Sequence, residues 1–410
     1  MIFKAADILL PHNTEMNRWA VIACDQYTSQ PEYWEETARL VGDAPSALHL
    51  ILPEAELGTD NRERAEQIHN MMRGYLTDGV FEKYPSCFVY VERTISDGSV
   101  RKGLVGAIDL EHYDYTPTAK SAIRATEQTV TERIPPRQMI RRGAPIELPH
   151  ILLLYDDLDD RIMSYVQNVK AELSLLYDFD LMQNGGHIKG RLISGKNAEA
   201  ATEAIRSYSD MIAERYKGCS GEPLLYAVGD GNHSLATAKA CWEEIKAELT
   251  PEEIETHPAR FALVELENIH DSSLKFEAIH RILKGVDASA LLKAAEKELC
   301  EEDGIPVEWI ADGKHGVLHL RRGHGALAVA VLQPWLDEWL KTHGGSIDYI
   351  HGADTAAKLA EEVGTAAFIL PAMEKSELFP GIMSGGVLPR KTFSMGHANE
   401  KRYYLEAKEI

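Results

Sequence analysis

The sequence predicts an α/β protein with additional α+β elements, and three features indicate this class. Short apolar runs suited to buried strands alternate with segments of helical period through the middle of the chain. Two β-rich runs flank the turn-forming pair Asp97-Gly98, which is typical of a hairpin. Further β-rich runs follow Val307, so antiparallel strands are expected beside the alternating ones.

Length and composition indicate a fully folded chain with more than one core. A chain of 410 residues exceeds the usual size of one hydrophobic core, and its 44% apolar and 26% charged residues match ordinary globular usage. We expect three regions: an N-terminal α+β region with a basic connector over 1–150, a middle α/β region over 151–285, and a C-terminal α+β region with a Gly-rich tail over 286–410.

The net charge restricts the class of partner. A formal charge of −21 opposes close approach to nucleic acid or to an anionic membrane, so neither is expected. An anionic small molecule would still bind where local Arg, Lys, N–H groups or a metal cation reverse the field inside a cleft. A small-molecule substrate is therefore expected, and a homo-oligomer stays open.

Cysteine usage and hydropathy predict a cytoplasmic protein. The five cysteines are odd in number, widely spaced and free of Cys-x-x-Cys pairs, which favours reduced thiols. The chain starts without a signal-type apolar run, and no stretch reaches the ~18 apolar residues of a membrane span.

The sequence of the first region predicts a strand, a loop, a helix and a hairpin, in that order. An apolar run at Trp19–Ala23 predicts a short strand, and Pro31 suits the first turn of a helix. A longer helix is expected over Arg62–Tyr75, and a hairpin over Cys87–Leu110.

A basic stretch without clean periodicity follows between Ala119 and Pro149. Pro135-Pro136 is expected to break any continuous helix there. A solvated connector and an anion-binding segment explain this stretch equally well. Its charged residues are Arg124, Glu127, Arg133, Arg137, Arg141 and Arg142.

The remaining elements complete the alternation. A buried strand is expected at Ile151–Tyr155, followed by amphipathic helices over about 160–176 and 198–216. Three β-rich runs from Val307 to Leu332, divided at Asp312-Gly313 and at 322–325, predict a meander. A last helix is expected near Thr355–Val363.

The most informative segment is the turn Gly229-Asp230-Gly231-Asn232-His233-Ser234. An apolar run, Leu224–Val228, precedes it, and apolar residues at helical spacing follow it, so it joins a strand to a helix. Glycines allow close approach to a ligand, and free N–H groups at a helix start favour a phosphate or carboxylate. Asp230 adds a metal-binding oxygen and His233 an imidazole.

A purely structural interpretation also fits this turn. Asn232 or Ser234 would cap the helix, and the glycines would only satisfy turn geometry. The spacings of a Walker loop and of a dinucleotide fingerprint are both absent.

The turn Val228–Ser234 resembles the Asp-Gly-His-His-Arg signature of the bacterial and archaeal family called domain of unknown function 1015. The early loop Asp25-Gln26-Tyr27 and the segment Ala125–Thr129 are similar to that family's early loop and its His-Glu-x-Thr segment. Matches at His280-Arg281, at Asp348–Gly352 and in the tail at Leu388–Phe393 extend the resemblance over nearly the whole chain.

The turn of this family also resembles the phosphate-binding turn of the ParB and sulfiredoxin superfamily, which includes kinases of free serine. This resemblance implies a ParB-like nucleotide-binding core with an added C-terminal α+β portion. It also implies ATP or a similar nucleotide held at residues 230–234, with Mg²⁺ bridging phosphates to carboxylates.

Two positions depart from the signature. Asn232 stands where the first His is usual, and Ser234 stands where an Arg is usual. Losing Arg removes a bidentate phosphate donor, which Arg390 and Lys391 would replace if the tail folds over the cleft.

The resemblance implies a phosphotransferase acting on a small hydroxylated metabolite, such as a free amino acid. Glu127 is then the candidate base and Asp230 the metal position, with His233 at the phosphates. Without the resemblance, we would expect Glu127 to be a surface or helix-capping acid and His233 to be a helix-capping hydrogen-bond donor. The expected phosphate-binding set is Gly229, Gly231, Asn232, Ser234, Arg390 and Lys391, and the expected substrate or anion set is Asp25, Arg124, Thr129 and Arg133.

Other assignments compete with this one. Arg137 is a further candidate anion clamp, whereas His280-Arg281 would equally brace two domains. Sixteen histidines, and Asp230 near His233, suggest a metal-dependent hydrolase, although no His-Glu-x-x-His motif supports it. A non-catalytic nucleotide sensor would suit Asn232 and Ser234.

Overall fold

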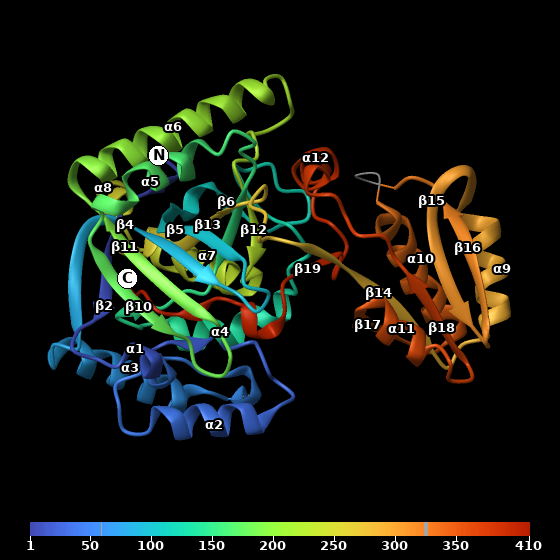
Figure 1. Ribbon diagram of the computed structural model, residues 1–410, viewed down its shortest axis with the longest axis horizontal. Helices are drawn as coiled ribbons and strands as arrows, with labels where there is room; N and C mark the ends of the chain where they lie inside the picture. Colours follow the sequence, from blue (N-terminus) through green and yellow to red (C-terminus); the bar gives the residue numbers. More distant parts are fainter. Residues whose placement is uncertain (59, 324–326) are drawn as a thin grey trace.

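Two β-sheets of different size organise the chain (Figure 1). The computed structural model describes residues 1–58, 60–323 and 327–410. Within these ranges eleven strands form the larger sheet and six the smaller, and none of the described helices is long and apolar enough to cross a membrane. The predicted α/β class with α+β elements is confirmed, because helices alternate with strands of both orientations.

The larger sheet is mixed. Its main path runs through β10 (Leu175–Asp180), β11 (His187–Ile193), β4 (Phe81–Thr94), β5 (Val100–Asp109), β13 (Phe261–Asn268), β9 (Leu152–Tyr155), β12 (Tyr226–Asp230), β7 (Ile123–Ala125) and β6 (Tyr113–Asp114). β1 (Phe3–Lys4) and β2 (Ala6–Pro11) pair with β5 and β4. β13 is parallel to β9, and β12 and β6 are parallel to β7. The predicted hairpin is β4–β5, and the predicted buried strand is β9.

Strand alternation divides the residues of this sheet between two cores. Val89 and Val105 pack on one face, whereas Phe88 and Leu104 pack on the other, because successive side chains point to opposite faces. The first core contains residues of α1 (Met16–Trp19), α2 (Pro31–Val41) and α3 (Arg62–Thr77). The second contains residues of α5 (Arg161–Val169), α6 (Gly195–Arg215) and α7 (Asn232–Lys246), with α8 (Pro251–Thr256) at its edge. Figure 1 shows α5 and α6 on the opposite side of the sheet from α1–α3.

The smaller sheet packs in a third core cluster, which also includes Leu154 and Ala227 of the larger sheet. Its order is β16 (Lys314–Leu320), β15 (Cys300–Ala311), β18 (Thr365–Ile369), β14 (Phe276–Lys284) and β17 (Ser346–His351), and β19 (Phe393–Met395) extends the pairing of β14. α9 (Ala288–Leu299), α10 (Ala328–His343) and α12 (Lys375–Gly385) pack into this core, and α11 (Ala353–Leu359) packs in a separate cluster. The change from one sheet to the other falls between Asn268 and Phe276, while the division at 150 and 285 stays a prediction.

Several element predictions need correction. The run ending at Leu332 is not a third strand but the start of α10, whose buried Val329, Leu332 and Leu336 recur at helical spacing around Pro334. The turn predicted at 322–325 lies partly outside the described residues. Pro135-Pro136 does not break a helix but opens α4 (Ile134–Arg141), because proline is tolerated in a first turn.

The boundaries of two other predicted helices also differ. The helix expected over 160–176 ends at Val169, because residues from Leu175 onward form an edge strand of the larger sheet. The helix expected at Thr355–Val363 is α11, which begins and ends earlier.

The C-terminal segment runs from the smaller sheet to two separate two-stranded sheets, and Ala407 bridges to Leu9 of β2 in the larger sheet. β20 (Tyr403–Tyr404) pairs with β3 (Val21–Ile22), and β21 (Lys408–Glu409) pairs with β8 (Ile146–Glu147). Three buried arginines donate to its carbonyl groups. Arg93 reaches Asn399 and Lys401, and Arg101 reaches Glu400; Arg281 reaches Arg390 and Lys391. These bonds fix the path of residues 390–401.

Replacing Arg93 with Ala should lower the free energy of unfolding by about 3 kcal/mol or more, because buried carbonyl groups of the tail lose charged donors. Chemical denaturation followed by tryptophan fluorescence measures this change. Arg206→Ala is the control, since Arg206 forms an exposed pair with Glu203 and its loss should cost under about 0.5 kcal/mol. Equal stability of the two variants would contradict the structural role of Arg93.

Candidate functional site

The turn between β12 and α7 is built around two glycines. Gly231 has a φ of +79° and ends the strand in a left-handed conformation. A Cβ at Gly229 would lie 2.7 Å from Cε of Met395 and 2.9 Å from Cγ of Leu154. A side chain at Gly229 would displace Met395 and Leu154, and one at Gly231 would be strained by the positive φ, so the helix begins directly beside the tail.

A cavity of about 400 Å³ opens at this turn. Its walls come from the β12–α7 turn, the segment after β7, the loop after β3 and the C-terminal tail. The predicted residues that line it are Asp25, Glu127, Arg133, Gly229, Asp230, Gly231, Asn232, His233, Ser234, Arg390 and Lys391. Two predicted residues, Arg124 and Thr129, do not line it.

The start of α7 presents unpaired groups to the cavity. Leu235 donates its N–H to Gly231, so the N–H groups of residues 232–234 precede the first helical bond. Within the described part of the chain, Asp230 Oδ2 and Asn232 Oδ1 are buried without a hydrogen-bond partner. The nearest cation of Asp230 is Lys401, whose Nζ lies 3.6 Å from Oδ2. Donors for an anion and oxygen ligands for a cation therefore meet at one turn.

His233 is a neutral member of this site. Its Nε2 accepts the N–H of Val130 at 3.3 Å. Burial, together with the charges of Arg137 and Arg133, lowers the pKa of His233 to about 4. At neutral pH the ring proton therefore resides on Nδ1, by inference from the Nε2 bond, and His233 can donate a hydrogen bond without adding a positive charge.

Glu127 lines the cavity and contacts the tail directly. Its Oε1 accepts the N–H of Thr392 at 3.1 Å, and its main chain pairs with Leu388. Burial raises the pKa of Glu127, although hydrogen bonds from the Lys391 and Thr392 main chain oppose this effect. A carboxylate with a raised pKa has greater proton affinity than a solvated one, which suits a general base.

The cavity gathers positive charge in an acidic protein. Five Lys or Arg side chains and four Asp or Glu side chains line it, whereas the whole chain has 43 and 64. Arg390 lies 3.0 Å from Asp337 and stacks over Tyr349, while Arg137 pairs with Glu54. Lys391 has a positive φ of 56°. The tail thus contributes three of these cations, namely Arg390, Lys391 and Lys401.

The remaining predicted residues are buried in the protein interior. Arg124 is buried and donates to the carbonyl groups of Ser121 and Glu222. Thr129 is also buried, and its hydroxyl has no partner among the described residues. Arg281 donates to the carbonyl groups of Arg390 and Lys391 in the tail, and His280 accepts the N–H of Leu370.

The arginines of the basic stretch divide between two roles. Arg133 and Arg137 line the cavity, whereas Arg141 and Arg142 form ion pairs with Glu147 and Glu244. An anion-binding role for Arg133 and Arg137 stays a prediction, whereas Arg141 and Arg142 are already paired with carboxylates.

Sequence reasoning missed Lys401 and His150. His150 Nε2 lies 4.0 Å from Oδ1 of Asp25, and Lys401 follows η8 (Ala398–Glu400) in the tail. No local sequence motif marks either residue, because both reach the cavity only through tertiary contacts. The segment Asp348–Gly352, which resembles the family's, is a usable signal for Tyr349, which also lines the cavity.

A second, smaller pocket of about 140 Å³ adjoins the cavity. It shares Cys24, Glu54, Arg137, His150 and Ser234 with the cavity. Its other walls are largely apolar and come from residues 50–57, 140–148 and α3. A ligand with one anionic and one apolar part would therefore fit across both spaces.

Comparisons with known proteins identify a family. The family model described as "Protein of unknown function (DUF1015)" matches residues 6–409, which confirms the resemblance carried by the motifs. No protein with a curated description matches the sequence.

Three solved structures match this chain at low identity and low TM-score. Free serine kinase in complex with AMP is 13% identical, with a TM-score of 0.38 over 72% of this chain and 96% of that one. SbnI with a C-terminal truncation, from Staphylococcus aureus, is 10% identical, with a TM-score of 0.36 over 71% and 82%. A conserved hypothetical protein from Pyrococcus furiosus is 15% identical, with a TM-score of 0.34 over 69% and 90%. At these values none of the three carries an argument about what this chain binds.

The stability contributed by His233 should fall as the pH falls from about 6.5 to about 4. The ordinary pKa of 6.5 applies to the unfolded chain, which takes up a proton in this window while the folded site does not. Thermal unfolding of the wild type and of His233→Asn across this range measures the effect. The wild type should lose more stability on acidification than the variant, and equal losses would contradict a neutral buried imidazole.

Proposed function

This chain belongs to the family described as "Protein of unknown function (DUF1015)", and we propose that it is a nucleotide-dependent phosphotransferase that acts on a small hydroxylated metabolite, such as a free amino acid. The observation that carries this proposal is the convergence, in one cavity, of a helix N-terminus, a carboxylate with raised pKa and five cationic side chains. Phosphoryl transfer requires these three elements, because it depends on positioning and on neutralising charge.

The phosphates of ATP are proposed to bind at the start of α7. Main-chain N–H groups of residues 232–234 and the helix dipole favour a phosphate there. The family signature has an Arg at the position of Ser234, and Ser carries no charge. Arg133, Lys391 and Arg390 supply positive charge to the phosphates in its place. The adjoining apolar pocket suits the flat base of the nucleotide.

Asp230 is the residue proposed to hold Mg²⁺. Its Oδ2 is buried and without a hydrogen-bond partner among the described residues, and a carboxylate oxygen is the ligand that Mg²⁺ prefers. Mg²⁺, when bound, would neutralise charge on the phosphates. Lys401, at 3.6 Å from this oxygen, would then be free to turn toward the phosphates.

Glu127 is proposed as the general base. A hydroxyl group of the acceptor would donate its proton to this carboxylate while its oxygen attacks the terminal phosphorus of the nucleotide, and the diphosphate would leave. The hydrogen bond from Thr392 fixes the orientation of the carboxylate. Tail and base are therefore positioned together.

A nucleotide sensor without turnover is the second candidate. Asn232 and Ser234 replace the histidine and arginine of the family signature, and His233 is uncharged at neutral pH. Such a protein would bind nucleotide through the same N–H groups and would release no ADP in the presence of any acceptor.

Asp230→Ala should weaken Mg²⁺-dependent ATP binding about 10-fold or more, because the proposed site loses its metal-binding oxygen. Titration calorimetry with ATP, with and without Mg²⁺, measures the affinity. Asp210→Ala is a matched control on the exposed surface of α6 and should bind as the wild type does. Unchanged Mg²⁺-dependent affinity in Asp230→Ala would contradict the assignment.

Glu127→Gln should retain nucleotide affinity and lose turnover by about 10²-fold or more, because only the proton acceptor is removed. ADP release with a panel of hydroxylated amino acids measures turnover. Glu132→Gln, an exposed neighbour outside the cavity, is the control. Wild-type turnover in Glu127→Gln would exclude it as the base, and wild-type nucleotide binding without turnover would favour the sensor.

A further inference from the structure

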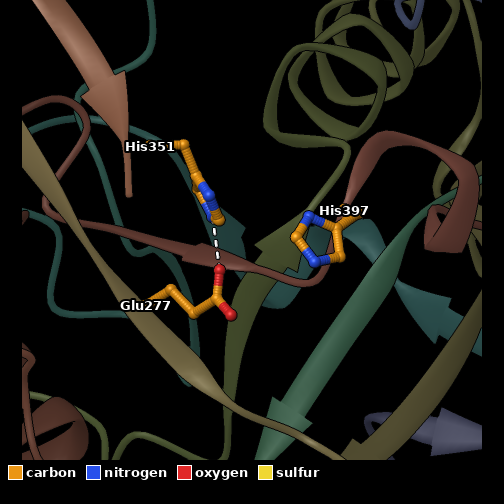
Figure 2. Close-up of side chains that lie close together, drawn as sticks. All are labelled: Glu277, His351 and His397. Atoms are coloured by element: carbon orange, nitrogen blue, oxygen red, sulfur yellow. Dashed lines mark ion pairs between the residues drawn. The ribbon is translucent and has the colours of Figure 1, made fainter. Parts of the chain in front are cut away.

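A second group of ligating side chains lies beside the cavity. Glu277 belongs to β14, His351 ends β17, and His397 lies in the tail directly before η8. Figure 2 shows the rings of His351 and His397 turned toward the carboxylate of Glu277. Three segments distant in sequence therefore present one carboxylate and two imidazoles to a common point.

The geometry of this group suits a metal ion. One ligand atom from each residue lies within 4.8 Å of the others. His351 Nε2 and Glu277 Oε2 form an ion pair at 2.5 Å, and neither atom has a further hydrogen-bond partner among the described residues. Ligand atoms about 2.1 Å from a tetrahedral ion are about 3.4 Å apart, so small rotations of the side chains would admit the ion.

The main chain holds all three residues in place. β14 pairs with β17, where His351 lies opposite Ile279. β14 also pairs with β19, where Ser394 lies opposite Glu277. His397 follows Gly396, which has a φ of +68°, and its N–H donates to the buried carboxylate of Glu400 at 2.9 Å. A preformed backbone of this kind leaves only side-chain adjustment for metal binding.

The donor set selects the class of ion. Two imidazole nitrogens and one carboxylate oxygen suit Zn²⁺ and related divalent transition metals, whereas Mg²⁺ and Ca²⁺ prefer oxygen ligands throughout. The nearby Lys275 pairs with Asp97 at 2.6 Å, so its charge is already partnered. Side-chain exposures of 36% for His351 and 37% for Glu277 leave room for an exchangeable ligand.

We propose that Glu277, His351 and His397 form a site for a divalent transition metal of the zinc type, with an open coordination position. The site lies at the rim of the cavity, because Ile279, Tyr349 and Met395 line the cavity and each stands two residues from one ligand. It is separate from the oxygen site proposed at Asp230, and it ties the tail to the smaller sheet. The proposal does not depend on phosphotransfer.

Zinc binding to chelator-treated protein tests this site. Competition with a chromophoric zinc chelator should give one tight equivalent for the wild type. His351→Ala and His397→Ala should each weaken that equivalent 10-fold or more, and the double variant should abolish it. His343→Ala is the control, because His343 is exposed at the end of α10 and lies outside the cluster, and it should retain wild-type affinity.

Two further readouts keep the test independent of folding and of nucleotide. Added zinc should raise the unfolding midpoint of the wild type and of His343→Ala but not that of the double variant, whose metal-free midpoint should match the wild type. Co²⁺ should give visible absorption bands typical of four or five ligands only when the cluster is intact. Failure of the wild type to bind zinc, or equal binding by the double variant, would overturn the proposal.

Discussion

The hydrogen bonds from three buried arginines to carbonyl groups of the C-terminal segment are the interactions on which the rest of this structure depends. Arg93 and Arg101 face each other across the β4–β5 hairpin, and Arg281 lies in β14 of the smaller sheet. A buried guanidinium must find acceptors, and the main chain of residues 390–401 supplies them. The tail is therefore bound to both sheets.

The position of the tail decides which chemistry the cavity can support. It carries Arg390 and Lys391 to one wall, orients the carboxylate of Glu127 through Thr392, and places Lys401 beside Asp230. The same segment delivers His397 to the zinc-type site. Both proposed sites are thus completed by residues more than 100 positions along the chain from the turn at 229–234.

Local patterns in the sequence were sufficient for some elements and for the glycine turn that borders the cavity. The glycines of the β12–α7 turn, the strand at 152–155 and the helix from Arg62 all follow from spacing and turn chemistry. Two outcomes did not follow, because they depend on tertiary context. Pro334 interrupts the pattern of α10, so its first turn resembled a strand, and Arg124 turns inward to satisfy carbonyl groups. Lys401 and the Glu277, His351 and His397 cluster depend on the path of the tail, which no local pattern encodes.

A crystal structure with Mg²⁺ and a non-hydrolysable ATP analogue would show directly whether the β12–α7 turn binds phosphate. We expect phosphate oxygens within hydrogen-bond distance of the N–H groups of Asn232, His233 and Ser234, with Mg²⁺ on Asp230 and Glu127 near the terminal phosphate. A nucleotide bound elsewhere on the protein, with this turn free of phosphate, would contradict it.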